Sequence, residues 1–301
     1  MAMKGEVTIR VALREGVTRL TESYYTPPYK VANITEDKKA PQLHLMLMCS
    51  SPGLLDGDET TIRLELGAGS HLQWHTQAYQ RLFRMEKGAC QRMEVLVGPG
   101  ASFCYLPHPC VPHAKAVFTG HNKIHLSEGS QLVWGEVLTC GRKLNGEVFS
   151  FSKYHTITEV LRCGRLVLRE NINLQPAVMD LQALGQLEGY THQAGLLFMG
   201  GAVGEGRLET VRRPETAGQP ETAGRPEVAG RPEVVRRPEA ARQPVIQAYL
   251  SSQTGVMGAV SDGPGGSLVV RILGNHAEQL YDCLKTIAGF LSFAKPLTYA
   301  G

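Results

Sequence analysis

Several features that mark common classes of protein are missing from this sequence of 301 residues. Its seven cysteines, an odd number, include no C-x-x-C pair, which argues against a disulfide framework and a structural zinc site. Aromatic residues make up only 7% and the net charge is only +3, so the composition does not indicate a nucleic-acid-binding protein. Neither G-x-S-x-G nor G-x-x-x-x-G-K-[ST] occurs, which removes two frequent signals of hydrolases and nucleotide-binding proteins.

Long apolar runs are also missing. No window reaches the ~18 apolar residues that a membrane-spanning helix needs. The first 16 residues carry a charge every few positions and lack the apolar stretch of a secretory leader. We therefore expect a soluble, cytoplasmic protein with reduced cysteines and with neither a nucleic acid nor a membrane as its partner.

What is present is a series of short β-strand patterns. Apolar residues alternate with mostly polar ones over residues 6–15, the period-2 signature of a half-buried strand, and Glu15-Gly16 suits a hairpin turn. Residues 43–49, LHLMLMC, are apolar at nearly every position, which favours a strand covered on both faces. Further strands are predicted at 147–154, 156–162, 165–173 and 196–203.

Three segments share one template: IRLELGAGSHLQW (62–74), MEVLVGPGASFCY (93–105) and NKIHLSEGSQLVW (122–134). Their turn glycines, Gly69, Gly100 and Gly129, stand 31 and 29 residues apart. This spacing is typical of repeats that stack to share one core. We infer a mainly β, stacked or solenoid-like architecture; three ordinary hairpins in a sandwich are the alternative.

Two helices are predicted. One begins at Pro176 and ends near Gly189, with apolar residues at helical spacing. The other, C-terminal, follows Asn275, which with Glu278 makes a start resembling a capping box. On this second helix, a stripe of apolar residues should pack on the sheet: Leu280, Leu284, Ile287 and Leu291.

Residues 213–242 differ from the rest, because units such as RPETAG and RPEVAG repeat every six residues. A proline in each unit prevents a continuous helix, and large apolar side chains are nearly absent, so this insert is expected to be disordered. The predicted organisation is a β domain over 1–211, an insert over 212–244, and a C-terminal strand and helix over 245–301 that complete the same domain.

The residues alone give two weak metal candidates. Asp56, Asp58 and Glu59 follow a proline-glycine bend and could bind a hard cation, but Asp-Gly-Asp is also common in tight turns. His108, Cys110 and His113 lie in a proline-rich loop and could bind a softer metal. Histidines four residues apart on one strand lie ~13 Å apart, so His71 with His75, and His121 with His125, cannot share an ion unless other strands contribute.

Five motifs taken together resemble one family. They are YYTPPYKV (24–31), LMLMCSSPGLLDGD (45–58), HTQAYQRLFRM (75–85), GEVLTCGRKLNGEVFSF (135–151) and VVRILG (269–274). Their identity and order are similar to those of the urease accessory proteins called UreD or UreH. The resemblance covers the chain from about residue 6 to 211 and again from about residue 245, and so omits the insert. The resemblance implies an acidic, leucine-containing segment at that place, and the insert departs from it. Because the composition of the insert is typical of disorder, deletion of residues 214–243 is expected to leave complex formation intact.

The resemblance implies a non-enzymatic maturation factor. Such a protein binds the urease apoprotein and the accessory protein UreF, and through UreF recruits the GTPase UreG, which supplies nickel. The implied fold is mostly β with two helices, in agreement with the repeats. No tightly bound cofactor is expected, only nickel in transit through an internal passage. Two alternatives stay open: a β-fold metalloenzyme that uses His108, Cys110 and His113, and an interaction module that handles no metal.

Residue by residue, the resemblance nominates motif positions for that passage. The acidic and basic candidates are Asp56, Asp58, Glu136, Arg142 and Glu147. A second group is expected to be structural or to face a partner: Pro27, Pro28, Tyr29, Lys30, Thr76, Gln77 and Tyr79. A conduit needs carboxylates that attract a divalent ion without completing a tight coordination shell.

Overall fold

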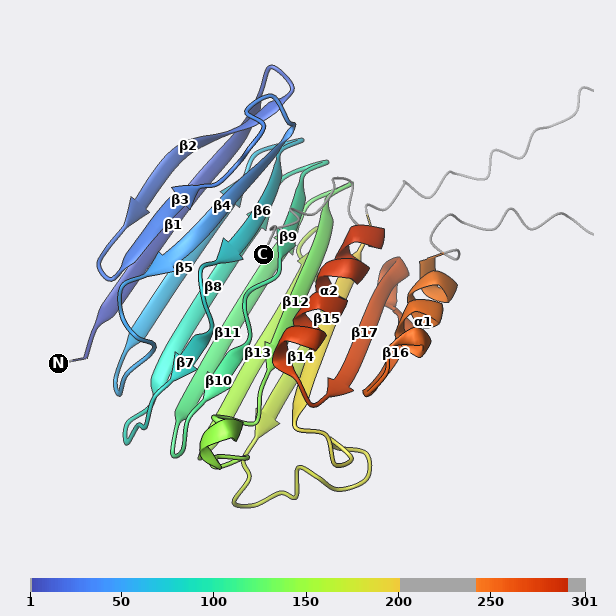
Figure 1. The fold of residues 1–301 in the computed structure, drawn as a ribbon. Coiled ribbons are helices and arrows are strands. Elements are labelled where there is room, and N and C mark those ends of the chain that lie inside the picture. Colours follow the sequence, from blue (N-terminus) through green and yellow to red (C-terminus); the bar gives the residue numbers. More distant parts are fainter. Residues whose placement is uncertain (1, 201–241, 292–301) are drawn as a thin grey trace, which may run out of the picture.

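Two β-sheets packed face to face form most of the protein (Figure 1). The computed structural model describes residues 2–200 and 242–291. The first sheet has seven strands in the order β14 (Arg165–Leu174), β13 (Lys153–Arg162), β11 (Val117–Leu126), β8 (Ala89–Val97), β5 (Glu59–Leu66), β1 (Lys4–Arg14) and β2 (Val17–Tyr25). The fold is thus mainly β, as predicted.

The second sheet has ten strands. Eight follow one path: β16 (Val256–Gly263), β17 (Ser267–Gly274), β15 (His192–Met199), β12 (Gln131–Leu138), β9 (Ser102–Tyr105), β6 (His71–Thr76), β4 (Gln42–Cys49) and β3 (Tyr29–Asn33). The short strands β7 (Gln80–Leu82) and β10 (Cys110–Pro112) pair with each other, and β10 also pairs with β12. The PPYK motif therefore precedes and opens an edge strand, where a proline's missing N–H is tolerated.

The three sequence repeats form three stacked arches. Each arch runs along a strand of the first sheet (β5, β8 or β11), turns, and continues in the second sheet (β6, β9 or β12), and equivalent strands pair in parallel. The turn glycines Gly69, Gly100 and Gly129 all have φ between 64 and 67°, which favours glycine. Successive turns are hydrogen-bonded, Gly69 N to Pro99 O at 2.8 Å and Gly100 N to Glu128 O at 3.0 Å. The stacked architecture is confirmed.

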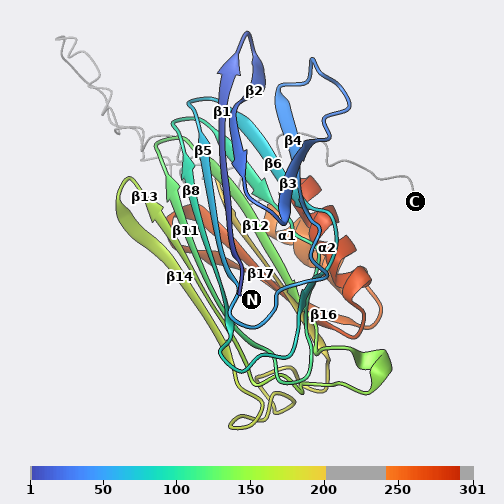
Figure 2. The ribbon, with the colours of Figure 1, turned by 90° about the vertical axis from the view of Figure 1, so that its left-hand side faces the viewer.

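A helical layer covers the outer face of the second sheet (Figure 2). It consists of α1 (Arg242–Ser252) and α2 (Ala277–Leu291), accompanied elsewhere by the short 3-10 turns Lys143–Asn145 and Pro264–Gly266. The predicted stripe on the C-terminal helix, which includes Leu280, Leu284 and Ile287, is buried against β12, β15 and β17. No described helix is long and apolar enough to cross a membrane.

Some sequence-based assignments were wrong. Residues 176–189 form turns, not a helix, because Gly185 and Gly189 have φ near 80° and the exposed Val178 and Leu184 do not share a face with the buried Leu181. The first helix is instead α1, which occupies the last residues assigned to the insert. Residues 147–152 are not a strand, since β13 begins at Lys153. The rest of the insert, 212–241, lies outside the described residues.

Candidate functional site: a row of cavities between the sheets

In the first sheet, one set of laterally paired residues on neighbouring strands, the polar rung, is small or polar where large apolar core residues are expected. The paired positions are Gly5, Thr60, Gln91, Gly120 and Thr156, from β1, β5, β8, β11 and β13. Side chains on alternate positions of these strands face the second sheet. The gap between the sheets is therefore roomy and able to hydrogen-bond beside Gln91, Gly120 and Thr156, which line a cavity there.

Three cavities adjoin in this gap. The first, of about 310 Å³, shares Gln80, Gln91 and His108 with a middle cavity of about 40 Å³. The middle cavity shares Trp134 and Glu136 with a third, of about 90 Å³. A water molecule needs at least ~10–15 Å³ of such volume and a few polar partners, so each cavity can hold water. The row extends from Cys49 at one end to Arg271 at the other.

Glu136 lies at the junction of the middle and third cavities, because it lines both. Its position follows from the alternation along β12, where Trp134 and Leu138 also point between the sheets while Val133 and Val137 face the helices. The Glu136 carboxylate accepts hydrogen bonds from Trp134 Nε1 at 2.9 Å and Asn122 Nδ2 at 3.3 Å. These donors leave lone pairs directed at the cavity.

Burial governs the charge of Glu136. Loss of hydration, followed by the negative charge of Glu170, raises the pKa of Glu136 to about 7, although the Trp134 hydrogen bond and Arg271 act in the opposite direction. The carboxyl group therefore titrates near neutral pH. A cation in the cavity would favour its ionised form.

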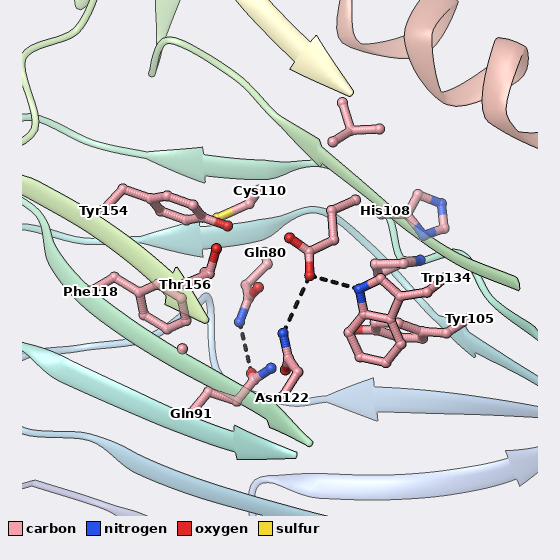
Figure 3. A pocket seen from close by; sticks show the side chains of 14 residues that line it. Gln80, Gln91, Tyr105, His108, Cys110, Phe118, Asn122, Trp134, Tyr154 and Thr156 are labelled. Atoms are coloured by element: carbon pink, nitrogen blue, oxygen red, sulfur yellow. Dashed lines mark hydrogen bonds between the residues drawn. The ribbon is translucent and has the colours of Figure 1, made fainter. Parts of the chain in front are cut away.

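An amide pair separates the first cavity from the middle one. Gln80 Nε2 donates to Gln91 Oε1 at 3.0 Å, and both residues line both cavities (Figure 3). Beside them, Thr76 Oγ1 accepts the backbone N–H of His108 at 2.8 Å. The polar wall thus continues from the first cavity into the second.

The motif HTQAYQ attaches this wall to α2. The Tyr79 hydroxyl donates to Glu278 in the first turn of α2, and the His108 ring lies 5.0 Å from that of Tyr281. Gln77 is exposed and lines the first cavity with Thr76 and Tyr79. Thr76 and Tyr79 have internal structural contacts, while any contact with a partner stays a prediction.

Asp56 and Asp58 both accept backbone hydrogen bonds. Asp56 Oδ1 accepts the N–H groups of residues 86–88 at 2.7–3.0 Å, and these bonds, Gly88's first, lower the pKa of Asp56. Asp58, which is buried, accepts from Met3 N at 3.0 Å and Leu55 N at 2.8 Å. Neither residue is in the walls of the three cavities.

Asp58 nevertheless acts electrostatically on the first cavity. Burial, and to a smaller extent the charge of Asp58, raises the pKa of Tyr29 to about 12 and raises that of the Cys49 thiol. Tyr29 and Cys49 both line the first cavity. The carboxylate therefore adds negative potential at this end of the row.

Arg142 and Glu147 form an ion pair within the loop that follows β12. Glu147 Oε2 accepts from Arg142 Nε at 2.9 Å and from Ala114 N at 3.1 Å, and Arg142 lowers the pKa of Glu147. The pair fixes the loop shape and lies outside the walls of the three cavities. A role in nickel transfer for these two residues stays a prediction.

The proposed soft-metal cluster is divided between two places. His108 and Cys110 line the middle cavity, whereas His113 packs edge-on against Phe83, with ring centroids 4.8 Å apart. Within 2–200 and 242–291, no group of three His, Cys, Asp or Glu side chains is placed to hold a metal ion. The geometry does not favour the metalloenzyme alternative.

The PPYK motif supports the first cavity. Tyr29 is buried, its hydroxyl lies 2.8 Å from Thr60 Oγ1, and its ring fills the space over Gly5, where a Cβ would come within 2.4 Å. Pro27 and Pro28 precede it at the corner between β2 and β3, and Lys30 is exposed. Within this motif, Tyr29 therefore has a structural role.

Sequence reasoning missed several polar wall residues, among them Gln80, Gln91, Asn122, Thr156, Glu170 and Arg271. For some of them the sequence contains a signal, which is a polar residue at an inward position of a strand. Asn122 occupies an inward position of β11 two residues before Ile124, and Thr156 an inward position of β13. Polar residues at the apolar phase of a strand indicate a hydrated interior.

Comparison with known proteins identifies the family of this chain. The profile of the family described as UreD urease accessory protein matches residues 3–297. The chain belongs to the UreD family. It is 37% identical to the urease accessory protein UreD of Flavobacterium johnsoniae over 285 residues, which cover 95% of this chain and 91% of the relative.

Shorter matches come from two other members of the UreD family. The UreD of Acetivibrio thermocellus is 35% identical over 191 residues, 63% of this chain and 73% of the relative. The UreD of Haemophilus influenzae is 35% identical over 193 residues, 61% of this chain and 74% of the relative. The family resemblance inferred from five motifs is confirmed, and the chain is a urease accessory protein by family.

Proposed function

We propose that this chain acts in urease maturation by carrying nickel through the row of cavities between its sheets. The proposal rests on the row of adjoining cavities between the sheets, which has polar groups in its walls and the buried, ionisable carboxylate of Glu136 at the junction of two of them. Nickel is the cargo and not a resident cofactor. The chain performs no catalysis in this scheme.

The chemistry of the walls supports transit over storage. Among the described residues that line the cavities, the carboxylates are Glu136 and Glu170, which a wall of hydroxyl, amide and imidazole groups accompanies. Ni²⁺ accepts oxygen and imidazole nitrogen ligands, but tight binding requires several together. One carboxylate lowers the free energy of the ion without trapping it.

The proposed partners follow from the family. The chain binds the urease apoprotein and UreF in the cytoplasm, and UreG joins through UreF. Asp58 supplies negative potential at the first cavity, and Asp56, Arg142 and Glu147 shape the loops at its periphery. Deletion of the repeat should leave this complex intact if it stops before Arg242, whose guanidinium lies 4.9 Å from the Phe198 ring.

The test is co-expression with the urease subunits and the other accessory proteins. Replacing Glu136 by Leu should lower nickel per urease at least about fivefold, because an uncompensated divalent charge is costly in a narrow gap. Glu136→Asp, which keeps the carboxylate, should retain most of the nickel. Affinity purification should recover UreF and urease with both variants.

Two results would overturn the proposal. Full nickel loading with Glu136→Leu would show that the ion does not use this gap. Failure to recover UreF or urease with the unaltered chain would remove the scaffold role. Normal urease activation by a chain with both Asp56 and Asp58 changed to Ala would exclude a transfer role for that pair and leave the Glu136 test decisive.

A further inference from the structure

The third cavity ends at an ion pair that joins the two sheets. Arg271, in the VVRILG motif, extends from β17 of the second sheet, and its Nη2 pairs with Oε1 of Glu170 on β14 of the first. The two strands belong to different sheets near the same edge of the sandwich (Figure 1). Both side chains line the third cavity.

This ion pair marks the end of the row at which the third cavity meets solvent. The Arg271 side chain is 51% exposed and that of Glu170 22%, although both also belong to the cavity wall. An ion that moves between Glu136 and solvent at this end must therefore pass the guanidinium group. The charges of Arg271 and Glu170 both act on the Glu136 carboxyl, which places all three within electrostatic range.

The chain provides space for the guanidinium at this position. Gly195 of β15 lies beneath it, and a Cβ at Gly195 would come within 2.8 Å of Arg271 Nη1. Arg271 Nη1 also donates to the backbone carbonyl of Val270 at 3.2 Å. These contacts hold the positive charge over the cavity mouth, although Glu170 is its only carboxylate partner among the described ion pairs.

We propose that Arg271 is an electrostatic gate, whose guanidinium occupies the Glu170 carboxylate and keeps cations out of the third cavity until the pair separates. A divalent cation is repelled by the guanidinium and competes with it for Glu170. Because ion pairs this exposed contribute little to stability, the pair can separate without unfolding its surroundings. A bound partner that withdraws the guanidinium would open the mouth.

The gate rests on the proposed passage of a cation through the cavities, but its test needs neither urease nor nickel delivery. Trp134 lines the middle and third cavities, and the chain's other tryptophan, Trp74, is fully buried in the apolar core. In the full chain with Trp74→Phe, stopped-flow quenching of Trp134 fluorescence by Ni²⁺ reports ion access. Acrylamide, a neutral quencher, reports steric access.

At pH 8, Arg271→Met should raise the rate of Ni²⁺ quenching about tenfold, equivalent to ~1.4 kcal/mol, and change acrylamide quenching less than about twofold. Arg271→Lys keeps the charge, so its rate of Ni²⁺ quenching should stay within about twofold of that of the parent chain. Arg63→Met is the matched control, because it removes one arginine from an exposed ion pair with Glu65.

Four outcomes would overturn the gate. Ni²⁺ quenching in Arg271→Met could equal that of the parent chain, it could be matched by Arg63→Met, or it could rise together with acrylamide quenching. Fast Ni²⁺ access with Arg271→Lys would show that charge does not control the mouth. The gate and the passage can also fail separately. If Arg271→Met gives the expected quenching but Glu136→Leu still loads urease with nickel, the passage is refuted and the gate is not.

Discussion

The same five strands of the first sheet carry two rungs of opposite character. One rung consists of Ile9, Leu64, Val95, Ile124 and Val160, all at most 1% exposed. The other, four residues earlier on each strand, consists of Gly5, Thr60, Gln91, Gly120 and Thr156. Strand pairing and register are identical, so backbone geometry alone does not explain the cavities.

The difference shows how a solenoid separates stability from function. Apolar side chains that repeat at one rung fill the gap between the sheets and exclude water, whereas Gln91, Gly120 and Thr156 of the other rung line a cavity that has room for it. Each rung crosses the five parallel strands of the sheet because parallel strands keep their register. One changed position on each of three neighbouring strands, β8, β11 and β13, therefore places small or polar residues side by side in the wall of the middle cavity.

The largest expected effect distinguishes the rungs by stability. Leu64→Ala should lower the free energy of unfolding by about 2–5 kcal/mol, because it leaves a cavity in a packed core. Thr60→Ala, on the same strand in the polar rung, should cost only about 0.5–1.5 kcal/mol through the lost hydrogen bond with Tyr29. Urea unfolding measures both, and equal losses would refute the contrast.

A smaller effect depends on pH and concerns Glu136. Its folded pKa of about 7 exceeds its ordinary value, so the folded state binds the extra proton and stability falls as pH rises from about 4.5 through 7. Glu136→Gln should remove this loss and be more stable than the parent chain by about 1–3 kcal/mol at pH 8. Near pH 5 the difference should shrink. Urea midpoints at both pH values check this, and a gain independent of pH would contradict it.

The smallest effect belongs to the ion pair at the end of the row. Arg271→Met should change the free energy of unfolding by less than about 1 kcal/mol, as is usual for an exposed pair. Thermal or urea unfolding of the parent and variant chains makes the comparison. A loss of several kcal/mol would identify Arg271 as a structural staple between the sheets instead of a gate.

Much of the fold was predictable because the repeat is local. Gly69, Gly100 and Gly129 each need positive φ at an arch, and the apolar alternation around them specifies which face is inward. The helix predicted from Pro176 failed for a tertiary reason: Leu181 and Leu187 are buried under the sheets by a series of turns that sequence periodicity cannot distinguish from a helix.

The site was predictable only in part. Glu136 was nominated through the family resemblance, and its inward phase on β12 would have indicated the same from the residues. The pair Glu170 and Arg271 could not be found in this way, because the two residues are 101 positions apart and meet only where β14 and β17 face each other. Asp56 and Asp58 stood out in the sequence, yet their carboxylates accept backbone hydrogen bonds that shape loops.

The most direct test of the polar rung is to make it apolar. Gln91→Leu combined with Thr156→Val keeps approximate side-chain size and removes two hydrogen-bonding groups from the wall of the middle cavity, which Glu136 also lines. Nickel bound per urease would be measured after co-expression, with equal recovery of the accessory complex as the condition. The nickel content should fall about tenfold, equivalent to ~1.4 kcal/mol. Unchanged nickel content in an intact complex would contradict it.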